Sequence, residues 1–175
     1  KLGIGPTIEN GFYYDFELPS AIGAGDLNGL EEVMRELVGQ KLEFKGKKVT
    51  AAQARKLFKA QPFKLDLIKE FTKAKKQLAV YESGGFADLC KGGHVKNTSA
   101  IHPDAFKLTK IAGAYWRGDE KNPQLTRIYG VAFGTKPELD EYLKLQEEIQ
   151  RRDHRVLGEK LDLFSQHDIA PGAIF

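Results

Sequence analysis

The segment from Phe86 to Thr135 constrains the fold most, because it is rich in glycine, aromatic and β-branched residues. These residue types favour short strands separated by tight turns. The segment predicts four strands, at 86–90, 105–111, 114–117 and 125–133. We therefore expect an antiparallel sheet to form the centre of this part of the chain.

The first residues predict a further antiparallel pair. Ile4–Ile8 and Phe12–Phe16 are apolar runs, and Glu9-Asn10-Gly11 lies between them. Asn-Gly is a strong hairpin-turn dipeptide, because both residues tolerate a positive φ. A β-hairpin is expected here.

Helical spacing of apolar residues marks the remaining elements. Asp26 can cap a helix over 27–41, and Thr50 can cap one over 51–59, before Pro62. Further predictions are a helix at 63–75, strands at 42–49 and 78–81, and a long helix at 138–156. The last helix is polar over more than half its surface, as a helix that bridges two domains would be. The predicted fold class is α+β, an antiparallel sheet with packed helices followed by a long linker helix.

Composition permits several functions and excludes few. The 175 residues are enough for one sizeable core, and a net charge of +3 permits contact with nucleic acid without requiring it. Lysines cluster at 45, 47 and 48 and at 73, 75 and 76, which we interpret as solvated helix ends and loops. No apolar run reaches about 18 residues, so no membrane span is predicted. One cysteine cannot form an intramolecular disulfide, which suits a reducing compartment and makes the cytoplasm the expected location.

The densest group of reactive residues is Asp88-Leu89-Cys90-Lys91-Gly92-Gly93-His94. Asp88 and Cys90 alternate on a predicted strand and would share one face. Cys90 and His94 can meet around a metal or a water, because two glycines let the backbone turn between them. Two ligands do not make a zinc site, which usually needs three or four. A buried structural cysteine and a histidine bonded within a turn remain the alternatives.

Two other features leave their function open. Tyr115 and Trp116 are most economically core aromatics, and the alternative is a wall on which a terminal adenine could stack. Lys64 starts a predicted helix, where most lysines are solvated. No phosphate-binding glycine loop is recognisable, since Gly3-Ile4-Gly5-Pro6 does not continue into GxGxxG.

Several separated blocks together resemble the editing domain of bacterial-type threonyl-tRNA synthetases. The blocks are Ile4–Asp15, Asp88–His94 and Ala112–Asp119, and 152–155 with 161–164 resembles the run into a class II catalytic domain. The Asp88–His94 block alone is shared with the editing domain of alanyl-tRNA synthetases. The block Gly113-Ala114-Tyr115-Trp116-Arg117-Gly118-Asp119 favours the threonyl family.

The resemblance implies a proofreading hydrolase that removes serine from mischarged seryl-tRNA(Thr). Four residues then correspond to its catalytic site: Lys64, Asp88, Cys90 and His94. Lys64 could hold the water or stabilise the oxyanion, His94 could orient or deprotonate the water, and Asp88 could bind the substrate ammonium group. For Cys90 we expect a hydrogen-bonding or shape role. The residues expected to contact substrate are Tyr13, Tyr14, Asp15, Gly92, Tyr115 and Trp116.

The resemblance also implies a domain order and partners. Residues 1–135 would be the editing domain without its first part, 136–157 the linker helix, and 158–175 the start of the catalytic domain. We expect no required cofactor in this segment, and zinc at Cys90 and His94 is the alternative. ATP and zinc are expected in the catalytic domain of the full-length protein. The expected partners are the 3′ acceptor end of tRNA(Thr), the remaining synthetase domains and, for the full-length protein, a second copy in a homodimer.

Two departures from the family pattern stand out. The family's HxxxH pair precedes the Gly5-Pro6 block, and no HxxxH occurs in these 175 residues. We expect a longer protein to supply it; without it the domain should edit poorly, or act as an acceptor-end binding module without catalysis. The other departure is Gly93, where proline is common in the family, and glycine should loosen the turn before His94. A zinc-stabilised structural domain is the third hypothesis.

Overall fold

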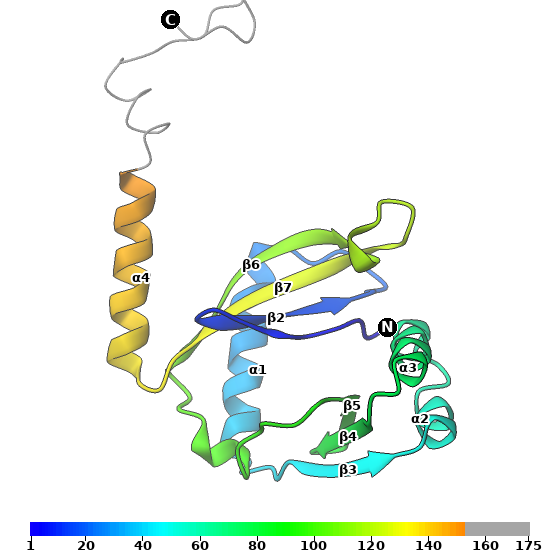
Figure 1. The fold of residues 1–175 in the computed structure, drawn as a ribbon. Helices are drawn as coiled ribbons and strands as arrows, with labels where there is room; N and C mark the ends of the chain where they lie inside the picture. The colour runs from blue at the N-terminus through cyan, green and yellow to red at the C-terminus, as the bar shows by residue number, and fades with distance from the viewer. Residues whose placement is uncertain (153–175) are drawn as a thin grey trace, which may run out of the picture. The chain divides into compact units, whose positions relative to one another are not determined.

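The computed structural model describes residues 1–152, which form two compact units that divide after Lys136. The first unit is an α+β arrangement of two antiparallel sheets with three helices (Figure 1). Sequence analysis predicted one antiparallel sheet, and the structure distributes the strands between two. Within the described residues no helix is long and apolar enough to cross a membrane.

The larger sheet has the order β1-β2-β7-β6, and every neighbouring pair is antiparallel. The predicted hairpin is present: β1 (Thr7–Ile8) pairs with β2 (Gly11–Phe16), and Asn10 takes a φ of 61° in the turn. The strand β7 (Gln124–Ala132) lies between β2 and β6 (Phe106–Tyr115). The second and last strands of the unit, β2 and β7, are therefore neighbours, which brings residues 112 positions apart into register.

The predicted break between strands 105–111 and 114–117 is wrong. β6 is one continuous strand, because Ala112 and Gly113 keep their pairing with Arg127 and Thr126. Its irregularity falls earlier, at a shift in register between Leu108 and Lys110. Trp116–Gly118 is a 3₁₀ turn and not the end of a strand.

The smaller sheet has the order β3-β4-β5. β4 (Leu78–Ser83) and β5 (Phe86–Leu89) form a hairpin, and β3 (Lys45–Val49) pairs with the other edge of β4. β3 is shorter than the predicted strand at 42–49. Residues 42–44 pair instead with the loop after His94, where Glu43 bridges to Asn97.

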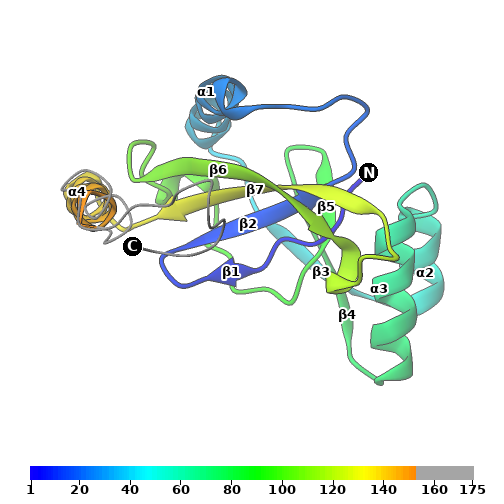
Figure 2. The ribbon, with the colours of Figure 1, turned by 90° about the horizontal axis from the view of Figure 1, so that it is seen from above.

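The three helices lie where they were predicted, but only Thr50 acts as the predicted cap; the Asp26 side chain accepts from the Gly23 N–H and does not cap α1. α1 (Leu27–Gly39) ends at Gly39, two residues earlier than predicted, and its Glu31 accepts a hydrogen bond from the Leu108 backbone N–H at 2.7 Å. α2 (Ala51–Leu57) starts with a capping box between Thr50 and Gln53. α3 (Pro62–Lys73) has proline in its first turn, where no backbone N–H is needed. Figure 2 shows α1 beside β6, with α2 and α3 on the other side of the unit.

The core has two parts that share α3. Apolar side chains of α2, α3 and β4 form one part: Ala54, Phe58, Ile68, Leu78 and Val80. The second part joins α3 to the larger sheet: Phe63, Leu67, Trp116 and Leu125. Phe71 and Leu89 pack against both parts. α3 is thus held on two sides, which makes it a rigid support for its remaining side chains.

Helix α4 (Lys136–Arg151) is described by itself, because it runs into the second unit. It starts two residues before the helix predicted at 138–156, at the first residue of the predicted linker segment 136–157, and is helical to Arg151. The rest of the predicted helix and the predicted start of a catalytic domain at 158–175 lie outside the described residues. The domain boundaries therefore stay a prediction.

Candidate functional site

Lys64 is the unusual residue of α3, because its side chain is only 2% exposed. It follows the buried Phe63 on the inward face of the helix. Its Nζ lies 2.6 Å from Asp88 Oδ1 on β5. A buried ammonium group is costly unless it is paired, and Asp88 supplies the pair. Sequence analysis had no reason from local pattern to distinguish Lys64 from a solvated lysine.

Asp88 is the centre of the polar cluster. Its Oδ1 accepts hydrogen bonds from Lys64 and, at 2.7 Å, from the Leu89 backbone N–H. Its Oδ2 accepts one from Tyr14 Oη at 2.5 Å. Three donors hold the carboxylate in place, while a carboxylate has about four lone-pair sites. These three donors leave about one lone-pair site of Asp88 unused.

Charge and burial have opposite effects on the pKa of Lys64. Burial lowers the pKa of Lys64, whereas the charge of Asp88 and its hydrogen bond act in the other direction. Cys90 makes a smaller contribution in the same direction, raising the pKa of Lys64. Burial, followed by the charge of Asp88, raises the pKa of Tyr14. Tyr14 is therefore a neutral donor to Asp88.

Cys90 and His94 form the exposed side of the cluster. Cys90 extends the pairing of β5, since its backbone N–H donates to Ala79 O at 3.2 Å. Its Sγ lies 3.6 Å from His94 Nε2. The imidazole stacks against Phe44, with ring centroids 5.1 Å apart, and against Tyr81 at 4.3 Å. Two aromatic rings from β4 and the loop before β3 thus orient His94.

The two glycines make the turn between Cys90 and His94. Gly92 has a φ of +102° and Gly93 a φ of +89°, values that side-chain-bearing residues rarely adopt. At Gly92 a Cβ atom would also lie 2.7 Å from Tyr81 Oη. Proline, with a φ near −65°, cannot adopt the conformation of Gly93. The turn at Gly93 therefore has a backbone conformation that a turn with proline at this position cannot have.

The predicted substrate-contacting residues fall into two groups. Along β2 side chains alternate between faces, so Tyr14 reaches Asp88 while Tyr13 and Asp15 point to the other face. Tyr13 and Asp15, with Tyr115 and Trp116, line a cavity of about 590 Å³. Only Tyr14 and Gly92 lie at the Lys64–Asp88 cluster. The substrate roles of all six residues stay predictions.

The cavity is bordered by two arginines that sequence analysis missed. Arg127 makes a two-point ion pair with the buried Asp15, at 2.6 and 2.8 Å, and covers the Tyr13 ring at 3.9 Å. Arg117 joins Asp66 and Glu70 of α3, both at 2.8 Å. Asp15 and Arg127 are 112 residues apart, so no local pattern could have paired them.

Trp116 is a core residue, the more economical of the two interpretations made from sequence. It is 6% exposed, packs on Phe63 and donates from Nε1 to Asp66 Oδ2 at 3.0 Å. Tyr115 is 43% exposed beside it. An exposed ring at Tyr115 remains open to stacking.

The predicted metal site has only two candidate ligands, Cys90 and His94. Among residues 1–152 no group of three or more His, Cys, Asp and Glu side chains could hold a metal ion. Since zinc usually takes three or four ligands, Cys90 and His94 do not by themselves fit such a site. We derive no chemical step through a metal.

Comparison with known proteins adds to this geometry. Residues 78–129, which carry Asp88, Cys90 and His94, match the family described as the threonyl and alanyl tRNA synthetase second additional domain. All of the chain aligns with bacterial threonine–tRNA ligases, at 53% identity for Borrelia hermsii (strain HS1 / DAH) and 51% for Borreliella burgdorferi (strain ZS7). The whole chain is therefore similar to part of a bacterial threonine–tRNA ligase. It spans about 30% of the length of these relatives.

The similarity to the second additional domain of threonyl and alanyl tRNA synthetases agrees with the fold. The matched residues 78–129 run from β4 to β7 and so include strands from both antiparallel sheets. Lys64 and Tyr14 lie outside the matched range, yet both contact Asp88 within it. The cluster is therefore built by more of the chain than the family match covers.

Proposed function

We propose that the Lys64–Asp88–Cys90–His94 cluster is the post-transfer editing site of a threonyl-tRNA synthetase, and that it hydrolyses seryl-tRNA(Thr). The buried Lys64–Asp88 pair beside Cys90 and His94 carries this proposal. A fully buried ammonium group next to an exposed histidine suits a reaction in which negative charge develops on an oxygen.

A synthetic site for threonine faces a physical limit. A pocket for the larger amino acid rejects one that lacks a methyl group by only about 1–3 kcal/mol. Serine is therefore attached to tRNA(Thr) at a low rate. A second pocket that admits serine and excludes the extra methyl group removes the error.

The proposed reaction is the hydrolysis of an ester. The water oxygen attacks the carbonyl carbon of the seryl group, and the bond from that carbon to the ribose oxygen breaks. His94 orients the water and passes a water proton to the leaving ribose oxygen. The products are serine and tRNA with a free terminal hydroxyl.

Each contact in the cluster supports a distinct role. Lys64 stabilises the negative charge on the carbonyl oxygen, and Asp88 holds Lys64 in place while its remaining lone pair binds the seryl ammonium group. Tyr14 positions Asp88 by its hydrogen bond. Cys90 shapes the pocket beside His94. The HxxxH pair known in the family would complete the site in a longer protein.

The parent protein is proposed to be a threonine–tRNA ligase that uses ATP. Threonine–tRNA ligase is the name of the aligned relatives, of which this chain covers about 30%. ATP and a zinc ion would belong to its catalytic domain. We propose that it acts in the cytoplasm as a homodimer and binds the 3′ acceptor end of tRNA(Thr).

Deacylation of labelled seryl-tRNA(Thr) tests the editing proposal. The proteins compared are this chain and a version extended upstream to include the HxxxH pair, each with Lys64→Met and with Lys107→Met as an exposed control. The extended protein should hydrolyse the ester, and Lys64→Met should slow it by roughly 10²-fold or more, the usual cost of losing an oxyanion donor.

Two results would contradict the proposal. The extended protein could hydrolyse seryl-tRNA(Thr) no faster than background, which would leave a binding module without catalysis. It could also hydrolyse threonyl-tRNA(Thr) as fast as the seryl ester, which would exclude proofreading.

A further inference from the structure

Charge is distributed very unevenly along this chain. Residues 41–76 contain twelve of the 27 Lys and Arg and only three of the 24 Asp and Glu, so their formal charge is +9. The other residues carry −6, which gives the net charge of +3. The mild overall charge therefore conceals one strongly basic segment.

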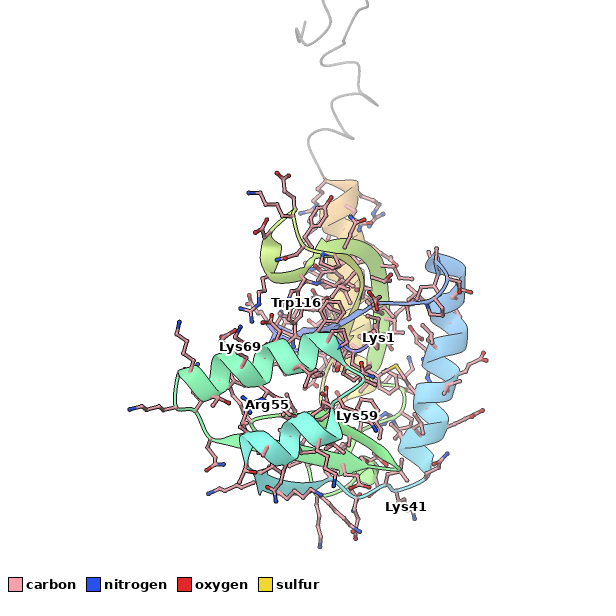
Figure 3. All side chains as sticks on the ribbon, turned by 90° about the vertical axis from the view of Figure 1, so that its right-hand side faces the viewer. Lys1, Lys41, Arg55, Lys59, Lys69 and Trp116 are labelled. Carbon is pink, nitrogen blue, oxygen red and sulfur yellow. The ribbon has the colours of Figure 1, made fainter. Side chains whose placement is uncertain are left out.

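This segment folds into one side of the first unit. It comprises β3, α2 and α3 with their connections, and Figure 3 labels Arg55 on α2, Lys59 in the turn after it and Lys69 on α3. Apart from the buried Lys64, all its cations are exposed: Lys41, Lys45, Lys47, Lys48, Arg55, Lys56, Lys59, Lys69, Lys73, Lys75 and Lys76. We call these eleven residues the basic face.

Local structure does not neutralise the basic face. Among residues 1–152 its one ion pair joins Lys45 to Glu43, at 3.4 Å with both side chains well exposed. Asp66 and Glu70, the two acids of α3, are bound to Arg117 instead. Lys69 and Lys73 lie four residues apart on α3, a spacing at which like charges destabilise a helix. The fold thus tolerates a repulsion that a polyanion would relieve.

The basic face borders the Lys64–Asp88 cluster. α3 directs Lys64 inward and carries Lys69 and Lys73 outside. In the smaller sheet Gly46 of β3 pairs with Tyr81, and Tyr81 pairs with Asp88. A polyanion on this face would therefore lie beside the proposed editing site.

The composition of the face favours a nucleic acid over a protein partner. Leu57 is its one exposed large apolar side chain within the described structure. Protein interfaces usually have an apolar and aromatic centre, which this face lacks. Dispersed lysines instead suit the regularly spaced phosphates of a nucleic acid.

We propose that the basic face binds the phosphate backbone of tRNA, close to the end that carries the ester. The inference rests on the proposed function for the identity of the RNA. It revises the interpretation of the lysine clusters as merely solvated residues. Binding here would be electrostatic, independent of sequence and sensitive to salt.

Fluorescence anisotropy with labelled, uncharged tRNA(Thr) at a series of KCl concentrations tests the inference. The variant Lys47→Gln/Lys59→Gln/Lys69→Gln is compared with Lys107→Gln/Lys121→Gln/Lys144→Gln, which removes the same charge from exposed positions elsewhere. The basic-face variant should bind about 10-fold or more weakly at low salt. The slope of log Kd against log salt should fall by roughly 2 to 3, the contribution of three phosphate contacts.

The outcomes separate this inference from the proposed function. Equal weakening by both triple variants would show a net-charge effect and overturn it, as would undetectable tRNA binding or no change in the basic-face variant. Circular dichroism of each variant checks that it is folded. The two proposals can also fail separately. If the slope of log Kd against log salt falls in the basic-face variant but the extended protein does not hydrolyse seryl-tRNA(Thr), the RNA-binding surface is supported and the editing site is rejected.

Discussion

At the scale of single residues, the candidate site depends on how one carboxylate is shared. Asp88 receives hydrogen bonds from Lys64, Tyr14 and the backbone of Leu89. Two of these partners also contact each other, because Lys64 Nζ lies 5.3 Å from the centre of the Tyr14 ring. Lys64 and Tyr14 therefore restrict each other's position. Gly5 belongs to the same arrangement, since a Cβ atom there would lie 2.2 Å from a Tyr14 ring carbon. The absence of a side chain at Gly5 thus leaves room for the Tyr14 ring in the position from which it contacts Asp88.

Tyr14 should be the last of the six tyrosines to ionise. Burial and Asp88 raise its pKa above the ordinary value of 10.0. Its contribution to folding stability is therefore complete below about pH 10 and is lost as the pH rises toward the folded-state pKa. In an alkaline titration followed by tyrosinate absorbance, Tyr14→Phe should remove the component that appears last. Tyr115→Phe, at an exposed ring, is the control, and loss of an early component in Tyr14→Phe would refute the expectation.

At the scale of elements, hydrogen bonds hold the loop after β5 at both ends. Cys90 continues the ladder with Ala79, and Thr98 accepts a hydrogen bond from the Leu42 N–H at 2.9 Å and donates to Val38 O at 3.0 Å. The Phe44 N–H also donates to Lys96 O at 3.2 Å. His94 therefore lies on a short span whose two ends are held by the smaller sheet and by the end of α1.

The two glycines of this span offer a matched comparison. Gly93→Ala should reduce the free energy of unfolding by about 1 kcal/mol, because alanine is strained at a positive φ while no atom lies near the new Cβ. Gly92→Ala adds the contact with Tyr81 and should also displace that ring. Urea denaturation measures the first effect, and the ring-current shifts of His94 in NMR spectra measure the second. Identical His94 spectra in the two variants would contradict the role given to Tyr81.

At the scale of the whole first unit, the pairing of β2 with β7 joins the beginning of the unit to its end. Asp15 and Arg127 are direct partners in this register and form the two-point ion pair at the cavity. Asp15 is 2% exposed, so its charge depends on Arg127 for compensation. Hydrogen bonding to Asp15 raises the pKa of Arg127, which keeps the guanidinium charged.

Removal of one partner of this pair should destabilise the unit. Asp15→Asn should reduce the free energy of unfolding by about 3 kcal/mol, since it leaves Arg127 without its carboxylate. Chemical denaturation measures the change, with Asp104→Asn as an exposed control. A change below about 0.5 kcal/mol, the usual range for surface substitutions, would show that solvent compensates Arg127.

The amino-acid sequence by itself determined the hairpin, the positions of the three helices and the resemblance to threonyl-tRNA synthetases. Asn10-Gly11, Thr50 and Pro62 act through their own backbone conformations, so their effects are local. Asp88, Cys90 and His94 were likewise found from one short block. The sequence misplaced the break in β6, because pairing with β7 overrides the local preference of Gly113.

Only the tertiary structure decided which residues from distant parts of the chain contact one another. It buried Lys64 against Asp88, brought Tyr14 to the same carboxylate, and separated Tyr13 and Asp15 into another cavity. It also gathered cations from β3, α2 and α3 on one side. The physical reason is that burial and ion pairing depend on contacts between residues distant in the chain, and hydrophobic or helical spacing carries no information about such partners.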